Sequence, residues 1–478
     1  MMRQKVTIVL ESNFVARWFA EVLECYGKAN EVEISFACLR TSGKGGAIWE
    51  KWLPKNIIRF WASKKLENCL SPQELDQDEP LLCFGDCQNF CAGSSNANVW
   101  ILEKGSDLAA SGLRGWFNFF HTFFWLGHPL VFSNSKTQQR FSIFFQTRDF
   151  KLSRNLGFLR FNLEKILDFL IYDKPHGYPV WSNNDFVHFP IREYIRYPFW
   201  QFLQKIKRKV LKANWQLVKM SRKSLERFTS VDETLIPLFS GEGWADPFIA
   251  DSGEGLFLFF EEIVQGKGQL SVLELNRKSL SPQGPSKTVM EKETHLSYPF
   301  VLNVDEQWYM IPENSAANDL SIYKAEAFPF EWTHFKTVFS GSKWVDTTPF
   351  FFKGKWWIFS VRKVADYGSS YQDLYLFYCD DILKDDWQVH PCNPVVSDVR
   401  HARGGGALFF YEGRLIRPAQ NCHNKYGGGL QFCEVLELSE ERYEERVLGE
   451  FRFPVNKPMS SFHTVALYGD HIIGDCYV

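Results

Sequence analysis

The sequence lacks a long hydrophobic run. Nowhere do apolar residues continue uninterrupted for the 18 or so positions that a membrane-spanning helix needs. The apolar stretch near the N-terminus ends at Glu11, which makes it too short for the hydrophobic region of a signal peptide. We therefore expect a cytoplasmic protein whose eleven cysteines are mostly reduced.

The sequence also lacks an excess of charge of either sign. It has 54 Lys and Arg residues against 56 Asp and Glu residues, which gives a formal net charge of -2. Binding to a phosphate backbone requires a concentrated basic surface that releases counterions. The composition therefore argues against nucleic acid as a partner.

Three common cofactor motifs are missing. Residues 11–13 (ESN), which follow the first expected strand, lack the glycine fingerprint that brings the backbone close to a dinucleotide. The glycines at 404–406 lack the Lys and Ser/Thr of a phosphate-binding loop. Cys83, Cys87 and Cys91 stand at four-residue steps rather than in the tighter pairs of structural zinc sites. We expect no nucleotide cofactor and no metal.

The sequence is rich in aromatic residues, with 45 Phe and 17 Trp among 478 residues. This length exceeds what one hydrophobic core usually organises, so two domains are expected. Residues 5–12 and 32–39 are β-rich and flank the helical pattern of residues 13–26. We predict an α/β domain over residues 1–195 and an all-β domain over residues 229–478.

The segment 196–228 between these parts is a predicted basic amphipathic linker helix. Its apolar side chains fall on one helical face, and lysines and arginines occupy much of the rest. The favoured interpretation is an inter-domain helix with a solvated cationic face. The alternative is peripheral contact with the anionic inner face of a membrane, by apolar burial and attraction of the cations.

Five similar hairpins follow from residue 229 to the end. Their turns lie near residues 254, 306, 354, 413 and 470, at intervals of 48 to 59 residues, and strand-like residues flank each turn. Repeats of this length with several strands each are typical of a β-propeller, in which blades bury their faces against one another. We predict five blades.

The register of these repeats places polar residues at equivalent positions. Asp246, Tyr298 and Asp346 each stand eight residues before a turn. Glu261, Glu313 and Gln420 each stand seven residues after one. Because the innermost strands of a propeller line its axis, we expect these side chains to converge there, with Phe248 buried between blades.

Carboxylates that meet in one polar cavity are what glycoside chemistry requires, because one must stay ionised while another holds a proton. We assign Asp246 as base or nucleophile, Glu313 as general acid and Asp346 as the carboxylate that orients substrate or adjusts a pKa. Further residues that we expect to bind substrate are the following: Tyr298, Trp356, Arg403, Arg417, Gln420 and His463.

Each of these residues also has a structural interpretation. Asp246, which precedes a proline, could fix a turn by accepting hydrogen bonds from backbone amides, and Asp346 could do the same. Glu313 could be an ion-pair partner. Trp356 and Trp357 alternate sides of one strand, so at most one of them faces a ligand.

Several ordered motifs carry a family resemblance over about residues 228–478. They include WADPF, FFEE, HLSYPFV, MIPEN, VDTTPFFFKGKWWIF, GRLIRPAQNC and YGGGL. This part resembles the propeller-like domain at the N-terminus of plant glucosamine inositolphosphorylceramide transferases. The resemblance implies a five-bladed propeller similar to those of arabinanase-type and levansucrase-type glycoside hydrolases. In the plant enzymes sugar transfer is attributed to a separate glycosyltransferase domain, which we do not expect in this chain.

Related bacterial proteins carry this domain behind a formyltransferase-like domain, and the first part of the chain resembles that Rossmann-like domain in degenerate form. The resemblance implies 10-formyltetrahydrofolate as cofactor. Folate-dependent formyltransferases use an Asn-x-His motif, whereas this chain has Asn118 and His121 with two residues between them. The usual Arg-Gly loop is also absent after His121.

The leading hypothesis is a carbohydrate-active protein of glycan or glycolipid biosynthesis, with a sugar, nucleotide-sugar or glycolipid substrate at the propeller axis. The first alternative is a folate-dependent sugar N-formyltransferase in which the propeller selects the acceptor. The second is a non-catalytic glycan-binding or scaffold protein, in which side chains fill the propeller channel. It would be favoured if Asp246 and Asp346 were each fully bonded to backbone with no cavity between them.

Overall fold

The computed structural model of the chain divides into two units, Met1–Tyr194 and Ile195–Val478. In the first unit it describes residues 5–12, 14–16, 19–20, 23–24, 33–40, 63–65, 81–84, 99–104, 130–134 and 140–143. In the second it describes residues 215–223, 228, 236–237, 243–314, 316–363, 370–384, 387–423, 426–451 and 461–477. No helix among these residues has the length and hydropathy needed to cross a membrane.

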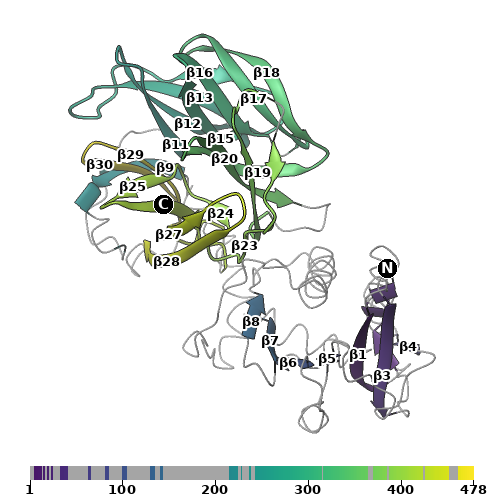
Figure 1. The fold of residues 1–478 in the computed structure, drawn as a ribbon. Helices are drawn as coiled ribbons and strands as arrows, with labels where there is room; N and C mark the ends of the chain where they lie inside the picture. Colours follow the sequence, from purple (N-terminus) through teal and green to yellow (C-terminus); the bar gives the residue numbers. More distant parts are fainter. Residues whose placement is uncertain are drawn as a thin grey trace. The chain divides into compact units, whose positions relative to one another are not determined.

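The first unit contains a six-stranded sheet in the order β3-β1-β5-β6-β7-β8 (Figure 1). Its strands are β1 (Lys5–Ser12), β3 (Glu33–Arg40), β5 (Leu81–Phe84), β6 (Val99–Lys104), β7 (Leu130–Asn134) and β8 (Arg140–Ile143). The first four of these pair in parallel, and β7 and β8 are antiparallel to their neighbours. A separate ribbon joins β2 (Phe14–Ala16) and β4 (Ser63–Lys65).

The parallel pair of β1 and β3 confirms the two strands predicted at residues 5–12 and 32–39. The helix predicted over residues 13–26 is wrong at its start, where Phe14–Ala16 form β2 by pairing with β4. A local apolar period cannot anticipate a partner strand that comes some fifty residues later. The formyltransferase-like assignment stays a prediction, because Asn118 and His121 lie outside the described residues.

The second unit is a five-bladed β-propeller built from antiparallel sheets (Figure 1). The first blade comprises β11 (Trp244–Asp251), β12 (Leu256–Val264), β13 (Lys267–Leu275) and β14 (Lys287–Met290). The second comprises β15 (Ser297–Val304), β16 (Gln307–Glu313), β17 (Asp319–Ala327) and β18 (Glu331–Ser340). The third comprises β19 (Lys343–Phe352), β20 (Lys355–Lys363), β21 (Asp373–Cys379), β22 (Gln388–Val389) and β23 (Val396–Ser397).

The last two blades depart from this plan. In the fourth, two short strands, β24 (Arg403–Gly404) and β25 (Phe409–Tyr411), share the partner β26 (Arg414–Gln420), which β27 (Leu430–Leu438) and β28 (Tyr443–Phe451) follow. The fifth has the order β10-β9-β30-β29. Its strands are β9 (Trp215–Ser221), β10 (Ile236–Pro237), β29 (Phe462–Tyr468) and β30 (His471–Tyr477).

The five predicted turns are confirmed, because each of them joins the two innermost strands of one blade. Local turn chemistry explains why they could be found. Gly354 and Gly413 take φ values of +80° and +77°, a conformation that glycine adopts without steric strain. The hairpin positions therefore follow from residues close together in the sequence.

The fifth blade closes the ring with strands from both ends of the domain. β9 pairs with β30 along its whole length, from Trp215 opposite Tyr477 to Ser221 opposite His471. The prediction of a linker helix over residues 196–228 is therefore wrong at residues 215–221, and residues 196–214 lie outside the described ones. Without β9, the edge of β30 would have unpaired backbone groups, and this long-range pairing outweighs the helical period of the local sequence.

Apolar side chains from neighbouring blades pack together between the sheets. Phe248 of β11 is 4% exposed, and its ring lies 4.7 Å from that of Tyr298 and 5.1 Å from that of Phe300, both on β15. This confirms the expected burial of Phe248 between two blades. The inner strands are thereby held at fixed positions around the axis.

Gly406 lies where the fourth blade contacts the fifth. Its φ is +127°, and a Cβ there would lie 2.1 Å from the carbonyl oxygen of Val465. We expect Gly406→Ala to destabilise the propeller by about 1–3 kcal/mol from backbone strain, with more from the clash. Thermal unfolding should show a midpoint lower by roughly 4–10 °C. Gly284→Ala, where nothing lies within 4 Å of the added Cβ, is the control, and equal midpoints for both variants would contradict the prediction.

Candidate functional site

The innermost strands of four blades share one irregularity. Their pairing skips two residues at Ala245/Phe248, Ser297/Phe300, Val345/Thr348 and Phe462/Val465. The first skipped residue is Asp246, Tyr298, Asp346 and His463 in turn, and the first three have φ values of +51°, +48° and +48°. A β-bulge re-aims the side chain it carries. Each of these four blades therefore presents a polar side chain from the same place.

Gly404 occupies the corresponding place in the fourth blade, since Arg403 pairs with Gln420 and Gly404 with Ala419. A Cβ on Gly404 would lie 2.9 Å from the backbone oxygen of Asp346 and 3.2 Å from the Tyr298 hydroxyl. The five inner strands thus converge, and glycine leaves room for the side chains of the other blades.

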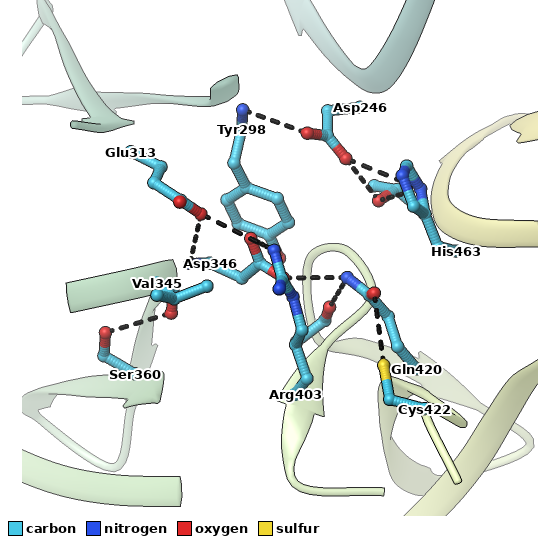
Figure 2. A network of polar contacts seen from close by, with 12 residues as sticks. Asp246, Tyr298, Glu313, Val345, Asp346, Ser360, Arg403, Gln420, Cys422 and His463 are labelled. Carbon is cyan, nitrogen blue, oxygen red and sulfur yellow. Dashed lines mark hydrogen bonds and ion pairs between the residues drawn. The ribbon is translucent and has the colours of Figure 1, made fainter. Parts of the chain in front are cut away.

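Asp346 is the centre of one half of the site (Figure 2). Its Oδ2 accepts hydrogen bonds from Arg403 Nε at 2.5 Å and from Gln420 Nε2 at 2.7 Å. Arg403 Nη2 also lies 3.2 Å from Asp346 Oδ1 and 3.7 Å from Glu313 Oε2. Side chains from the second, third and fourth blades therefore form one ion network, and the predicted group of Asp346, Glu313, Arg403 and Gln420 comes together.

Asp246 is the centre of the other half. Its Oδ1 accepts a hydrogen bond from Thr464 Oγ1 at 2.6 Å and lies 3.7 Å from His463 Nδ1. His463 Nδ1 lies 2.6 Å from Asp475 Oδ2. The fifth blade thus places an imidazole between two carboxylates, and His463 is in the site as predicted.

Carboxylates also bind the amides of the bulges. Asp475 Oδ2 accepts a hydrogen bond from the Asp246 amide at 2.8 Å. Asp246 Oδ2 accepts one from the Tyr298 amide at 3.2 Å, and Glu313 Oε2 accepts one from the Asp346 amide at 3.3 Å. Asp246 therefore has a structural task as well, whereas the Asp346 carboxylate accepts hydrogen bonds from the side chains of Arg403 and Gln420.

Burial raises the pKa values of two of these carboxyl groups. Burial, and then the charges of Glu261, Asp475 and Asp346, raise the pKa of Asp246 to about 7 against the opposing effect of His463. Burial and the charge of Asp346 hold the pKa of Glu313 well above its ordinary value, although Arg403 lowers it. The raised pKa favours the protonated form of Glu313, while Asp246 gains or loses its proton near neutral pH.

The pKa of His463 is also raised, which for an imidazole favours the charged form. Burial alone would lower the pKa of this imidazole, but the charges of Asp475 and Asp246 outweigh burial and raise the pKa to about 9. His463 is therefore a cation at neutral pH. A cation 3.7 Å from Asp246 favours the ionised carboxylate.

Tyr298 lies in the site as a buried support. Its hydroxyl is 2.8 Å from Thr348 Oγ1 and accepts a hydrogen bond from the Gly406 amide at 3.0 Å. It therefore links the second, third and fourth blades. Tyr298 is fully buried. Its predicted role in substrate binding stays a prediction.

The structure places two predicted binding residues elsewhere. Trp356 lies at the hairpin end of β20, five residues from Val361, whose partner is Val345, so it is about 17 Å along the strand from the acids. It packs against an apolar cluster between blades. Arg417 bonds Glu445 through Nε at 2.8 Å and through Nη2 at 2.7 Å. Arg417 belongs to a second buried ion network, away from Asp346.

Sequence reasoning missed Asp475, Thr464 and three aromatic side chains near Arg403 and His463: Trp215, Tyr371 and Tyr426. Asp475 had a signal, because an acid in the otherwise apolar strand HIIGDCY needs a buried partner. Trp215 had none, since the segment around it was interpreted as a helix.

Two groups among the described residues are close enough to hold a metal ion: Asp246, His463 and Asp475, and His401, Cys433 and Glu445. The ligand atoms of each group lie within 4.8 Å of one another. In the second group Glu445 is already paired with Arg417, whose fixed positive charge disfavours a second cation. In the first group the imidazole is held between the two carboxylates.

Comparison with protein families identifies the propeller region. Residues 234–462 match the family described as glucosamine inositolphosphorylceramide transferase 1, N-terminal. Glucosamine inositolphosphorylceramide transferase 1 of Oryza sativa subsp. japonica is 32% identical over 209 residues, which cover 42% of this chain and 27% of the rice protein. Its Arabidopsis thaliana namesake is 30% identical over 205 residues, 42% of this chain and 26% of that protein. The match spans about a quarter of each relative.

Solved structures with a similar fold include two glycoside hydrolases. The alpha-L-arabinanase of Cellvibrio cellulosa, complexed with arabinohexaose, has a TM-score of 0.32 and 14% identity and covers 44% of this chain and 78% of its own. The GH43_1 enzyme from Xanthomonas citri, complexed with xylotriose, has a TM-score of 0.38 and 10% identity and covers 54% of this chain and 92% of its own. The propeller described above rests on the strand pairing of this chain itself.

Proposed function

Because residues 234–462 belong to the family of N-terminal domains of glucosamine inositolphosphorylceramide transferases, we propose that this protein is a carbohydrate-active protein of glycan or glycolipid biosynthesis. It binds a sugar-containing substrate at the propeller axis and acts there on a glycosidic bond. The observation that carries the proposal is that Asp246, Glu313 and Asp346 lie in one buried polar site (Figure 2), in which burial raises the pKa values of Asp246 and Glu313.

The geometry gives each acid a different task. Glu313 holds a proton and is the general acid that protonates the leaving oxygen as the glycosidic bond breaks. Asp246, when ionised, accepts a proton from the attacking water or hydroxyl group, or attacks the sugar carbon itself. Asp346 is held by Arg403 and Gln420 and acts on Glu313, because its charge raises the pKa of that carboxyl. Two carboxyl groups at different protonation states are the requirement for this chemistry.

In the scaffold alternative, side chains fill the propeller channel. Aspartates that are each fully bonded to backbone, with no cavity between them, would favour it. Asp246 meets one amide and one hydroxyl, and the partners of the Asp346 carboxylate are side chains. Side-chain partners can exchange for substrate hydroxyl groups more readily than backbone ones, which favours a binding site. The formyltransferase alternative has no support among the described residues.

The pH dependence of turnover tests the role of Asp246. The rate should rise with pH through about 7 as Asp246 loses its proton and should fall at higher pH as Glu313 loses its own. In His463→Gln the cation that lowers the pKa of Asp246 is gone, so that pKa rises and the acidic limb moves to higher pH. The measurement is cleavage of a panel of aryl glycosides by the full-length protein, with product read after quenching.

His471→Gln is the matched control, because His471 lies on the same hairpin and its strand partners are Tyr468 and Ser221. Its acidic limb should coincide with that of the wild type. An acidic limb that stays in place in His463→Gln, or moves to lower pH, would show that Asp246 is not the group that titrates.

A further inference from the structure

Four aromatic side chains form a continuous row beside the acid site. The ring centroids of Tyr371 and Tyr426 lie 6.0 Å apart, those of Tyr426 and Trp215 lie 6.3 Å apart, and those of Trp215 and Tyr477 lie 5.4 Å apart. They come from the loop before β21, the loop before β27, and strands β9 and β30. We call this row the aromatic arc: Tyr371, Tyr426, Trp215 and Tyr477.

The aromatic arc contacts the two cations that hold the acids. The Arg403 guanidinium lies 5.2 Å from the ring centroid of Tyr371 and 4.9 Å from that of Tyr426. The His463 ring is stacked on Trp215 at 4.0 Å and meets Tyr426 edge-on at 5.2 Å. One face of the arc is thus fixed against Arg403 and His463 by cation–π and ring contacts.

The aromatic arc is more exposed to solvent than the charged side chains that it contacts. Tyr426 is 37% exposed, and Tyr371, Trp215 and Tyr477 are half-buried. The side chains of Arg403 and His463 are 9% and 2% exposed, and that of Asp346 is 2% exposed. Aromatic rings therefore stand between solvent and the acids, so a ligand that approaches the acids from this side meets the rings first.

We propose that the aromatic arc is a stacking platform for an uncharged sugar ring, which positions the neighbouring glycosidic bond over the acids. The proposal rests on the proposed function and adds the binding surface and the kind of sugar. A sugar ring has an apolar C–H face, which packs on an aromatic ring, and a rim of hydroxyl groups, which donate to carboxylates. Tyr426, with the most exposed ring, is the main contact.

The charges beside the arc select against an anionic ligand. Carboxyl groups outnumber cationic side chains in the site even when Glu313 is protonated, because Asp246, Asp346 and Asp475 lie beside only Arg403 and His463. Arg403 is already paired with Asp346 and Glu313. A phosphate or a uronic carboxylate would meet this negative field without a cation of its own. A neutral ring avoids that repulsion.

The test is glycan binding by the full-length protein and its Tyr426 variants. The probe is a printed array of neutral, amino-bearing and uronic oligosaccharides, and free nucleotides are added as competitors. The neutral glycan that binds most strongly is then titrated in solution. Tyr426→Ala should weaken its binding by about tenfold or more, and Tyr426→Phe, which keeps the ring, should stay within about twofold of wild type. Phe351→Ala removes a 54% exposed ring at the far end of β19 and should change nothing.

Each other outcome overturns the inference. Unchanged affinity in Tyr426→Ala, no binding to any neutral glycan, or preferential binding of uronic glycans or nucleotides would each do so. The Asp246→Asn variant separates this inference from the proposed chemistry. If Asp246→Asn leaves turnover unchanged while Tyr426→Ala loses glycan binding, the platform stands and the role of Asp246 falls. If Asp246→Asn abolishes turnover while Tyr426→Ala binds glycan normally, the role of Asp246 stands and the platform falls.

Discussion

Asp246→Asn is expected to lower turnover of a glycosidic substrate by roughly 10²- to 10⁴-fold, because an amide can neither accept the proton nor attack the sugar carbon. The fold should be retained. The Asn oxygen can still accept the hydrogen bond from the Tyr298 amide, and Thr464 Oγ1 can accept one from the new NH₂ group in place of donating to Asp246. The measurement is aryl glycoside cleavage together with the midpoint of thermal unfolding.

Asp251→Asn is the matched control for this variant. Asp251 lies on the same strand, β11, but at its exposed end, where it pairs with Arg277. Its turnover should equal that of the wild type. Undiminished turnover in Asp246→Asn, with an unchanged unfolding midpoint, would leave Asp246 with its amide-binding task alone and would make the ring of acids a scaffold.

Arg417→Ala is expected to destabilise the propeller by about 3–5 kcal/mol, because removing one partner of a buried ion pair leaves the other charge uncompensated. The Arg417 side chain is 2% exposed and that of Glu445 is 4% exposed. Arg417 also donates to the backbone oxygen of His401 at 2.6 Å. His401 Nδ1 lies 3.0 Å from Glu445 and keeps part of the compensation, which favours the lower end of the range. Urea unfolding followed by tryptophan fluorescence measures the change.

Arg446→Ala provides the comparison for Arg417→Ala. Arg446 pairs with Glu434 at 2.7 Å, but its side chain is 62% exposed, so its loss should cost only about 0.2–1 kcal/mol. The double variant Arg417→Met with Glu445→Leu should recover much of the lost stability, since it removes both charges. Equal effects of Arg417→Ala and Arg446→Ala would contradict a buried, interdependent pair.

The sequence predicts those parts of the propeller that depend on neighbouring residues. Hairpin turns repeat because each needs its own turn residues, and the fixed distance from turn to bulge places Asp246, Tyr298 and Asp346 in register in the sequence itself. The strand that closes the fifth blade was not predicted, because the pairing of β9 with β30 joins residues from opposite ends of the domain. The helical spacing of apolar residues in the segment 196–228 cannot show such a partner.

Strand geometry explains why Arg417 lies away from Asp346. Successive side chains on a strand point to opposite faces, and Arg417 and Gln420 are three residues apart on β26. They must therefore face opposite sides, so Gln420 joins Asp346 while Arg417 joins Glu445. Counting residues along the strand would have separated them. The register of the repeats already predicted that Gln420 faces the axis, so Arg417 had to lie on the opposite face of β26.

The pairing of β9 with β30 also sets the order in which the site is completed during synthesis. As the chain leaves the ribosome, Asp246, Glu313, Asp346 and Arg403 all emerge before β30. The ring stays open until residues up to Tyr477 have cleared the exit tunnel, because only then can β30 pair with β9. Asp475, which binds the Asp246 amide and His463, arrives with that last strand. A nascent chain that stalls before residue 471 therefore contains these acids without the closed ring that fixes Asp246.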